Sequence, residues 1–135
     1  MILLSNSAQQ TIPAGESLTF DTTIIKMGCS ECHRENSASI RMRCNGVYRV
    51  TFSGNVTGEA ADVEVQLSLR LGGETLPETQ MRSTPGSASA FNNVSTTTAI
   101  KNGCVDYNRV TVTNTGTVPI IVGANSALLI EKALH

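Results

Sequence analysis

Apolar and polar side chains alternate with a period of two along several segments of the chain. The longest such segment runs from Val63 to Leu71, and every odd-numbered residue in it is Val or Leu. Successive side chains of a β-strand point to opposite faces of the sheet. The pattern therefore predicts a half-buried antiparallel strand, with the odd-numbered residues inward and polar residues such as Ser68 outward.

A second alternating segment follows Asn45-Gly46, with Tyr48, Val50 and Phe52 on its apolar face. Asn-Gly suits the positive φ angles of a type I′ turn, and Ile40 to Cys44 alternates before it, so the sequence predicts a hairpin here. Runs rich in Val, Ile and Thr predict further strands at Leu18 to Ile25, Val94 to Ile100, Arg109 to Thr113, Ile120 to Val122 and Ala127 to Glu131.

Turn-forming residues separate these strands, and no segment of ten residues has an apolar stripe at helical spacing. Roughly seven to nine short strands without a repeat period predict an all-β fold, an antiparallel two-sheet jelly-roll sandwich. Residues 26–37 and 74–90 are expected to be long loops. Residues 1–11 are expected to form an N-terminal arm, and residues 12–135 the jelly-roll domain.

Composition narrows the possible partners. The chain has 135 residues, 16% of them charged, a net charge of −1 and 4% aromatic residues with no Trp. Neither a basic face nor aromatic stacking platforms are available, so no nucleic-acid partner is expected. The first residues have neither the basic stretch nor the apolar length of a signal peptide or membrane span. No membrane partner is therefore expected. The protein is expected to be made in the cytoplasm of a bacterial host.

Several short motifs occur in a recognisable order. They are Ile12-Pro13-Ala14-Gly15 followed by Phe20, Gly46-Val47-Tyr48, Val63 to Leu71 before Gly72-Gly73, and Ala127 to Leu134. In this order they resemble the superfamily of complement-type globular heads and tumour-necrosis-factor ligands. Bacterial and phage members of that superfamily end collagen-like filaments or stand alone on particles.

The resemblance implies a ten-strand jelly roll and a compact homotrimer, packed through apolar strand faces around a threefold axis. The segment from Ala127 to Ile130 is apolar on both faces, as burial on both sides requires. One of Leu129 and Ile130 is expected to face the core and the other a partner. The chain has too few aromatic residues for the aromatic-rich trimer interface of vertebrate members of the superfamily. None of its residues matches a known ligand site of the superfamily.

Few residues are candidates for chemistry. His33 is the only candidate general base, since His135 ends the sequence, and it has no evident orienting partner, so no catalytic site is expected. Cys29, Cys32 and His33, with Cys44 or Cys104 as a fourth ligand, suit tetrahedral zinc. Alternatively, Cys29 and Cys32 are loop thiols or form a local disulfide, and the protein then has no cofactor.

The resemblance also bears on the other two cysteines. In the family, strand B lies beside strand G, which implies that Cys44, at the end of one, lies near Cys104, just before the other. These residues are expected to be neighbouring thiols or a disulfide. Cys29 and Cys32 are expected nearer the opposite end of the barrel, which argues against one site made of all four thiols.

Two further patterns have ordinary surface interpretations. Asn55-Val56-Thr57 and Asn93-Val94-Ser95 match the glycosylation acceptor pattern, but without a secretory signal they are expected to be polar turn and strand residues. Arg41, Arg43 and Arg49 predict positive charge on one sheet face. That face is either solvated or binds an acidic partner.

These observations favour a structural protein rather than an enzyme. The leading hypothesis is a bacteriophage capsid decoration or head-fibre protein of the virion, a homotrimer whose N-terminal arm docks on a capsid or fibre protein. One alternative is the receptor- or glycan-binding head of a tail fibre or spore-surface filament, at the bacterial or spore surface. Another is a zinc-dependent or redox protein using Cys29, Cys32 and His33.

Overall fold

The computed structural model describes residues 1–28, 30–102 and 108–134. Strands form almost all of its regular structure. The described residues contain one short 3-10 helix, η1 (Pro77–Thr79). The strands are β1 (Ile2–Ser5), β2 (Gln10–Ile12), β3 (Thr22–Lys26), β4 (Glu31–His33), β5 (Ile40–Met42), β6 (Gly46–Gly58), β7 (Val65–Leu71), β8 (Glu74–Thr75), β9 (Met81–Ser83), β10 (Asn92–Asn102), β11 (Asn108–Asn114), β12 (Ile120–Val122) and β13 (Ala127–Leu134).

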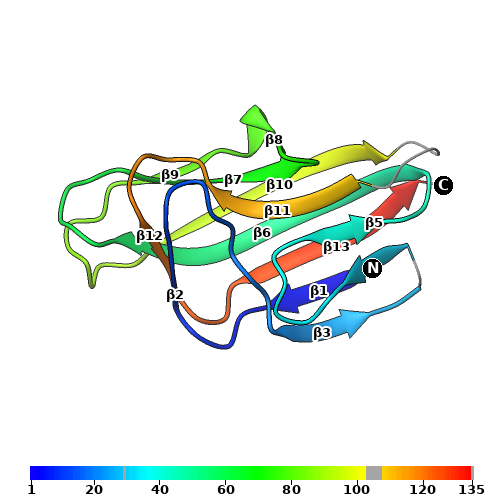
Figure 1. The fold of residues 1–135 in the computed structure, drawn as a ribbon, viewed down its shortest axis with the longest axis horizontal. Helices are drawn as coiled ribbons and strands as arrows, with labels where there is room; N and C mark the ends of the chain where they lie inside the picture. Colours follow the sequence, from blue (N-terminus) through cyan, green and yellow to red (C-terminus); the bar gives the residue numbers. More distant parts are fainter. Residues whose placement is uncertain (29, 103–107, 135) are drawn as a thin grey trace.

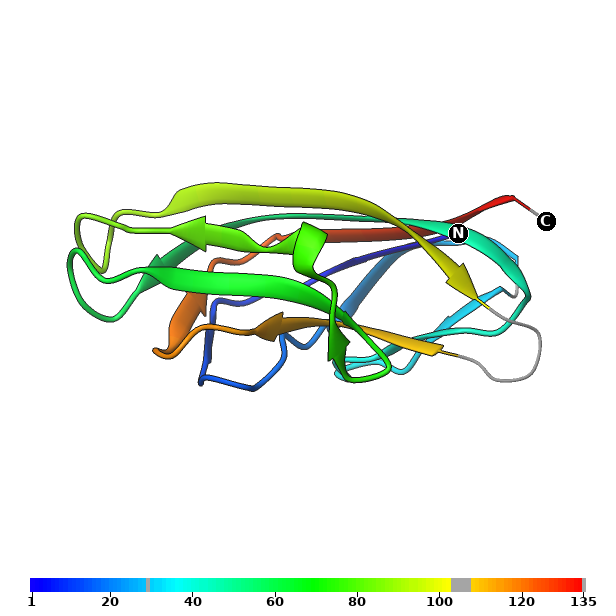
Figure 2. The ribbon, with the colours of Figure 1, turned by 90° about the horizontal axis from the view of Figure 1, so that it is seen from above.

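Two antiparallel sheets account for these strands over the described residues. The seven-stranded sheet has the order β2-β12-β6-β13-β1-β3, with β10 also paired to β6. The six-stranded sheet has the order β4-β5-β11-β7-β8, with β9 also paired to β7. The sheets are stacked as two layers, and both ends of the chain lie at one end of the molecule (Figures 1 and 2). The expected all-β jelly-roll sandwich is confirmed.

The core fills the space between the two layers. From the seven-stranded sheet, alternate residues of β6 and β13 point inward and are fully buried, including Tyr48, Phe52 and Ile130. From the six-stranded sheet, β7 and β11 contribute buried residues such as Leu67 and Val112. These four strands thus each bury one face, as a period-two pattern predicts, because alternate side chains leave the pleat on opposite sides.

The expected hairpin at Asn45-Gly46 is wrong. β5 pairs with β4 and β11, whereas β6 pairs with β10, β12 and β13, so the turn connects the two sheets. The apolar faces of β5 and β6 therefore meet across the core instead of lying side by side. Alternation specifies which face of a strand is buried but not which strand lies beside it.

The segment expected to be an N-terminal arm belongs to the seven-stranded sheet. β1 lies between β13 and β3, with Leu3 opposite both Leu129 and Ile25. Ile2 and Leu4 are buried in the core, so removing the segment would open one side of the sandwich. Four residues are too short a run for alternation to distinguish a strand from an arm.

Other boundaries shifted in smaller ways. β7 starts at Val65, because Asp62 adopts a left-handed conformation with φ 58° and Val63 is exposed. In the segment from Leu18 to Ile25, only the end is a strand, β3, and Phe20 makes an isolated bridge to Ser37. Both expected long loops contain short strands: β4 in the first, β8 and β9 in the second.

Candidate functional site

The outer face of the seven-stranded sheet carries an apolar row that crosses several strands. Strand register places Ile25 beside Leu3, Leu3 beside Leu129, and Leu129 beside Thr51. Thr97 of β10 continues the row beyond Thr51, with 3.3 Å between the two hydroxyl oxygens. We call these five residues the outer row. It is apolar over β3, β1 and β13 and uncharged throughout.

The alternation of β13 explains why the outer row exists. Leu128 and Ile130 are fully buried in the core, so Leu129 between them must project to the outside. It is half-buried by its neighbours on β1 and β6. Of the two residues considered in the sequence analysis, Ile130 is the one that faces the core. That Leu129 faces a partner stays a prediction.

Apolar exposure is greatest at the β3 edge of the outer row. Ile24 is 57% exposed, Ile25 39% and Met27 62%, and all five residues of β3 are exposed. An edge strand offers unpaired backbone groups as well as side chains, and exposed apolar edges commonly mark contacts with another chain. This edge is therefore a candidate contact surface for another chain.

Charge borders the outer row in one place. Arg49 of β6 and Glu131 of β13 pair across the strands at 3.1 Å, with side chains 59% and 32% exposed. A pair so exposed contributes little to the stability of one chain. Beside an apolar row, however, a charged pair suits the rim of an interface, where it fixes orientation more than it adds affinity.

The structure separates the residues proposed to bind zinc. Cys32 and His33 are consecutive in β4, so their side chains leave opposite faces of the strand. The His33 ring stands edge-on to Phe20 of the core, at 6.2 Å between ring centroids, and its Nε2 lies 2.9 Å from the Ser37 carbonyl oxygen. Cys32 instead lines a hollow on the outer surface.

Cys29 and Cys104 lie outside the described residues, and so do the sites built on them. Among the residues that the structure does describe, no three His, Cys, Asp or Glu side chains gather closely enough to hold a metal ion. The zinc hypothesis stays a prediction, which elemental analysis of the purified protein would test directly. His33 Nδ1 is buried without a hydrogen-bond partner in the described part of the chain.

The expectation that Cys32 lies nearer the opposite end of the barrel from Cys44 is wrong, because Cys32 is opposite Arg41 and the Arg43 amide donates to the Ser30 carbonyl oxygen at 2.7 Å. The surroundings of Cys44 do agree with the strand neighbours that the family resemblance implied. β11 pairs with β5, the strands corresponding to G and B, with Asn108 opposite Met42. The Asn102 side-chain amide donates to the Met42 and Cys44 carbonyl oxygens at 3.2 and 2.9 Å. Asn102 and Asn108, on either side of residues 103–107, therefore both lie at the end of β5 that precedes Cys44. Whether Cys44 bonds to Cys104 stays a prediction.

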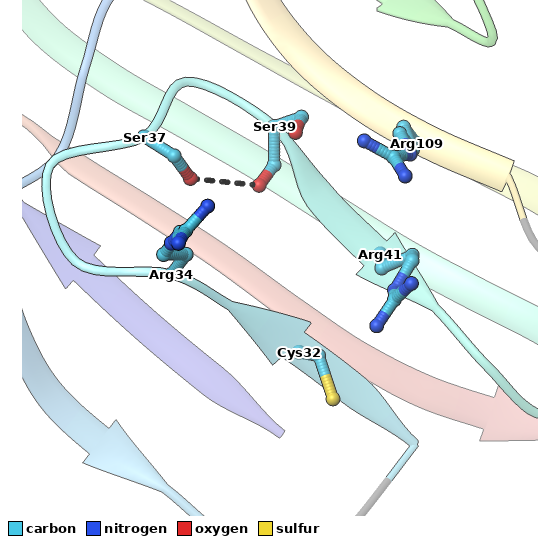
Figure 3. A pocket seen from close by; sticks show the side chains of 6 residues that line it. All are labelled: Cys32, Arg34, Ser37, Ser39, Arg41 and Arg109. Carbon is cyan, nitrogen blue, oxygen red and sulfur yellow. Dashed lines mark hydrogen bonds between the residues drawn. The ribbon is translucent and has the colours of Figure 1, made fainter.

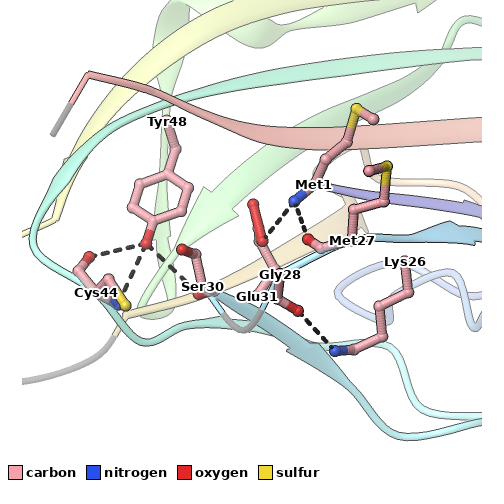
Figure 4. A network of polar contacts seen from close by, with 8 residues as sticks. All are labelled: Met1, Lys26, Met27, Gly28, Ser30, Glu31, Cys44 and Tyr48. Atoms are coloured by element: carbon pink, nitrogen blue, oxygen red, sulfur yellow. Dashed lines mark hydrogen bonds and ion pairs between the residues drawn. The ribbon is translucent and has the colours of Figure 1, made fainter.

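A network of polar contacts near Cys44 connects side chains and backbone groups from several segments (Figure 4). The Tyr48 hydroxyl donates to the Cys44 carbonyl oxygen at 2.8 Å and accepts from the Cys44 amide at 3.2 Å. Burial raises the pKa of the Tyr48 hydroxyl above its ordinary value. Nearby, the Met1 ammonium lies 2.9 Å from a carboxylate oxygen of Glu31, whose side chain is 1% exposed.

Buried asparagines were not identified from the sequence, although they hold several connections in place. Asn6 donates to Ala8 and Gly123, Asn102 to Met42 and Cys44, and Asn114 to Ile12 and Val118. Asn6 and Asn114 each join two segments, and Asn102 ties the end of β10 to the end of β5. Asn also occurs in ordinary turns, so its residue type alone gave no signal of this role.

No protein-family model and no curated protein matches the sequence. Solved structures do match. The globular domain of zebrafish complement 1qA protein superposes with a TM-score of 0.74 at 12% identity, over 98% of this chain and 95% of that one. Eiger TNF from S. frugiperda gives 0.76 at 13%, over 97% and 90%. Murine APRIL at pH 5.0 gives 0.69 at 12%, over 97% and 98%.

These superpositions cover nearly the whole chain, and at 12–13% sequence identity they show a shared fold. The chain therefore has the jelly-roll fold of complement globular heads and tumour-necrosis-factor ligands, as the motif order indicated. Within the described residues, no helix has the length and apolarity needed to cross a membrane.

Proposed function

We propose that the protein is a non-enzymatic structural component that works as a homotrimer, assembled through the outer row. The observation that carries this proposal is the apolar run of Ile25, Leu3 and Leu129 across three adjacent strands on a face turned away from the core. Contiguous apolar surface of this kind is costly to leave in water and is relieved by association.

The threefold state rests on the family resemblance, and the composition of the outer row fits it in a modified form. Aliphatic and Thr side chains occupy the face where aromatic residues would be expected in an aromatic-rich seam. Such a seam buries less area per residue, since Phe and Tyr bury 150–250 Å² each. We infer a trimer held by many modest contacts, which is sensitive to a single charge at its centre.

The particular role that we propose is decoration of a bacteriophage capsid, or a place in a head fibre of the virion. Its support is the resemblance to phage members of the superfamily and the absence of a catalytic constellation in the sequence. Because β1 is part of the sheet, docking on a capsid or fibre protein would not use a free arm.

Oligomeric state tests the assembly proposal. Multi-angle light scattering at micromolar concentration is expected to report the mass of three chains. Leu129→Asp is expected to give a single folded chain, because a carboxylate cannot be buried unpaired in an apolar interface.

The matched control is Thr111→Asp, on a half-exposed position of β11 in the other sheet, which should leave the trimer intact. A monodisperse monomer for the unaltered protein, or a trimer that survives Leu129→Asp, would overturn the proposal. Circular dichroism of each variant separates dissociation from unfolding.

Gene order tests the particular role. Capsid and portal genes beside this gene are expected if the protein decorates a virion. Neighbouring genes with collagen-like repeats would instead support a surface filament, and the capsid proposal would then be abandoned while the trimer stands.

A further inference from the structure

A small apolar hollow lies at the end of the sandwich that is farther from the chain termini. β6 and β11 both run toward this end, so the connections that follow them, residues 59–64 and 115–119, lie there together (Figures 1 and 2). Residues of both connections line the hollow, which encloses about 200 Å³. Its walls are the aliphatic side chains of Ala60, Val63, Val65, Val118 and Pro119, with Glu59 as the charged member of the lining. We call it the end hollow.

Backbone packing fixes the shape of the end hollow. Val65 begins β7 and is 1% exposed, so it forms the base. A Cβ atom on Gly58 would lie 3.0 Å from Cγ1 of Val65, so the end of β6 approaches this side chain as only glycine can. The Asp62 amide donates to the Pro85 carbonyl oxygen at 2.8 Å, which anchors the connection after β6. The end hollow is therefore preformed, as binding pockets usually are.

The size of the end hollow suits one side chain of an occupant. Small-molecule sites usually enclose about 300–1,000 Å³, whereas a cavity of about 150 Å³ already holds a molecule the size of benzene. A volume of about 200 Å³ therefore takes one aliphatic side chain of medium size. Val63 lines the hollow yet is 36% exposed, so an entering side chain would remove apolar surface of both molecules from water. A single anchor residue seated in a pocket is a common centre of protein recognition.

The charge around the end hollow suits basic residues beside that anchor. Glu59, Asp62 and Glu64 are exposed in the connection after β6. Arg82 is the only basic residue of segments 54–66, 81–92 and 114–125, all of which the structure describes, and it lies 4.0 Å from Glu64. The Glu59 and Asp62 side chains make no hydrogen bond or ion pair among the described residues. Their negative potential attracts Lys or Arg and repels the phosphates of a nucleic acid.

The basic residues that the sequence analysis named lie elsewhere. Arg41 and Cys32 line a separate hollow on the outer face of the six-stranded sheet, which shares no lining residue with the end hollow (Figure 3). Arg49 belongs to β6 of the other sheet, so the expectation of one face with Arg41, Arg43 and Arg49 is wrong in part. The acidic surroundings of the end hollow are therefore a local feature of that end.

We propose that the end hollow is the docking site for a second, basic polypeptide. The partner inserts one aliphatic side chain between the two connections and places Lys or Arg residues against Glu59 and Asp62. This inference goes beyond the assembly proposed above and does not depend on it, because the outer row lies on a sheet face and the end hollow at one end of the sandwich. The apolar anchor supplies most of the affinity, and the carboxylates select the flanking residues.

NMR titration of the isotope-labelled full chain tests the site with a capped peptide that has one leucine between two pairs of lysines. Saturable shifts are expected at Ala60, Val63 and Val118, with a Kd of about 1 mM for so small a probe. Exchanging the leucine of the peptide for glycine is expected to lower the affinity about tenfold. Exchanging its lysines for glutamines is expected to lower the affinity about threefold at low salt.

Variants of exposed residues test the protein side of the contact. Glu59→Gln combined with Asp62→Asn is expected to lower the affinity about threefold, and Asn tolerates the left-handed φ of 58° at position 62. Val63→Ser is expected to lower it about fivefold, because it removes part of the apolar wall. Glu74→Gln is the matched control, since it removes an exposed carboxylate from β8, outside the end hollow. Its affinity should stay within about twofold of the unaltered protein.

Four results would each overturn the proposal. An equal loss in Glu74→Gln would mean general charge attraction, and equal binding of the glycine peptide would mean that no side chain is anchored. Saturation of the same amides by butanol, with no added affinity from the lysines of the peptide, would mean a small-molecule site. A mass that grows with concentration beyond that of the trimer in the unaltered protein, but not in Val63→Ser, would mean that a second copy of this chain is the occupant. Absence of saturable shifts would overturn it as well.

Discussion

At the scale of single residues, β7 shows that a side chain on the outer face of a strand can also be buried. Leu67 and Ser68 are adjacent and both fully buried, although they point to opposite faces. Leu67 enters the core, whereas Ser68 is covered by the connection after β11, with 2.8 Å between its Oγ and the Thr115 hydroxyl. The expectation that Ser68 faces solvent is therefore wrong, because alternation cannot foresee a loop folding over the polar face.

Leu67→Ala is expected to lower the free energy of unfolding by about 2–5 kcal/mol, through a cavity in the core. Ser68→Ala is expected to cost about 0.5–1.5 kcal/mol, the usual contribution of one hydrogen bond. Urea unfolding of both variants measures the difference. Equal losses at the two positions would contradict the inward direction of Leu67.

Tyr48 gives the protein a specific sensitivity to alkaline pH. Burial raises the pKa of its hydroxyl in the folded state, while the unfolded chain ionises near its ordinary value of about 10. The stabilisation is fully present below about pH 10 and is lost as pH rises through the folded pKa, because the unfolded state releases the proton first.

Tyr48→Phe isolates this effect. At neutral pH it is expected to cost about 1–3 kcal/mol, since both Cys44 backbone groups lose their Tyr48 partner. From pH 8 to 11, the stability difference between the unaltered protein and Tyr48→Phe should stay level and then shrink above about pH 10. A difference that grows with pH would contradict the raised pKa.

At the scale of elements, Asn114 ties the end of β11 to two neighbours. Its side-chain amide donates to the Ile12 carbonyl oxygen of β2 at 2.9 Å and to the Val118 carbonyl oxygen before β12 at 2.8 Å. Asn114 is fully buried, so no water replaces the amide when it is removed. The position of β2 and β12 at the end of the seven-stranded sheet therefore depends on one side chain in the six-stranded sheet.

Asn114→Ala is expected to lower the free energy of unfolding by about 2–4 kcal/mol, because it leaves two carbonyl groups short of a partner. Asn92→Ala is the control, since Asn92 is exposed and makes one side-chain bond, to Ser83 at 2.9 Å. Its cost should stay below about 0.5 kcal/mol. Comparable losses in guanidinium unfolding would show that the Asn114 bonds do not anchor the connection.

At the scale of the whole molecule, the two sheets have outer faces of opposite character. The seven-stranded sheet exposes the apolar outer row, and the six-stranded sheet exposes hollows lined in part by Arg34 and Arg70. A sandwich places these faces on opposite sides of one core. Assembly through the outer row, as proposed, would leave the outer face of the six-stranded sheet accessible.

Assembly through the outer row also links stability to concentration. If the native state is a trimer, mass action raises the midpoint of thermal unfolding as chain concentration rises. A hundredfold dilution should lower the midpoint of the unaltered protein, whereas the midpoint of Leu129→Asp should not move. Calorimetry over that range measures both, and a midpoint independent of dilution in the unaltered protein would speak against a trimer.

The sequence by itself determined the inward face of several strands and the fold that they build. Period-two alternation identified Leu67 and Phe52 as core residues, because the pleat of a strand sends every second side chain to the same face. It left open which of Leu129 and Ile130 faces the core. The order of the short motifs indicated the complement-head and tumour-necrosis-factor-like jelly roll.

Alternation did not determine which strands are neighbours; the family resemblance implied that β5 lies beside β11, and only the tertiary structure showed the other pairings. Arg41 and Arg109 are far apart in the chain, and their juxtaposition depends on β5 pairing with β11 rather than with β6. A different pairing, that of β4 with β5, put Cys32 opposite Arg41 and His33 opposite Ile40. A strand pattern encodes a face but not a partner, because partners are chosen by long-range packing of the whole core.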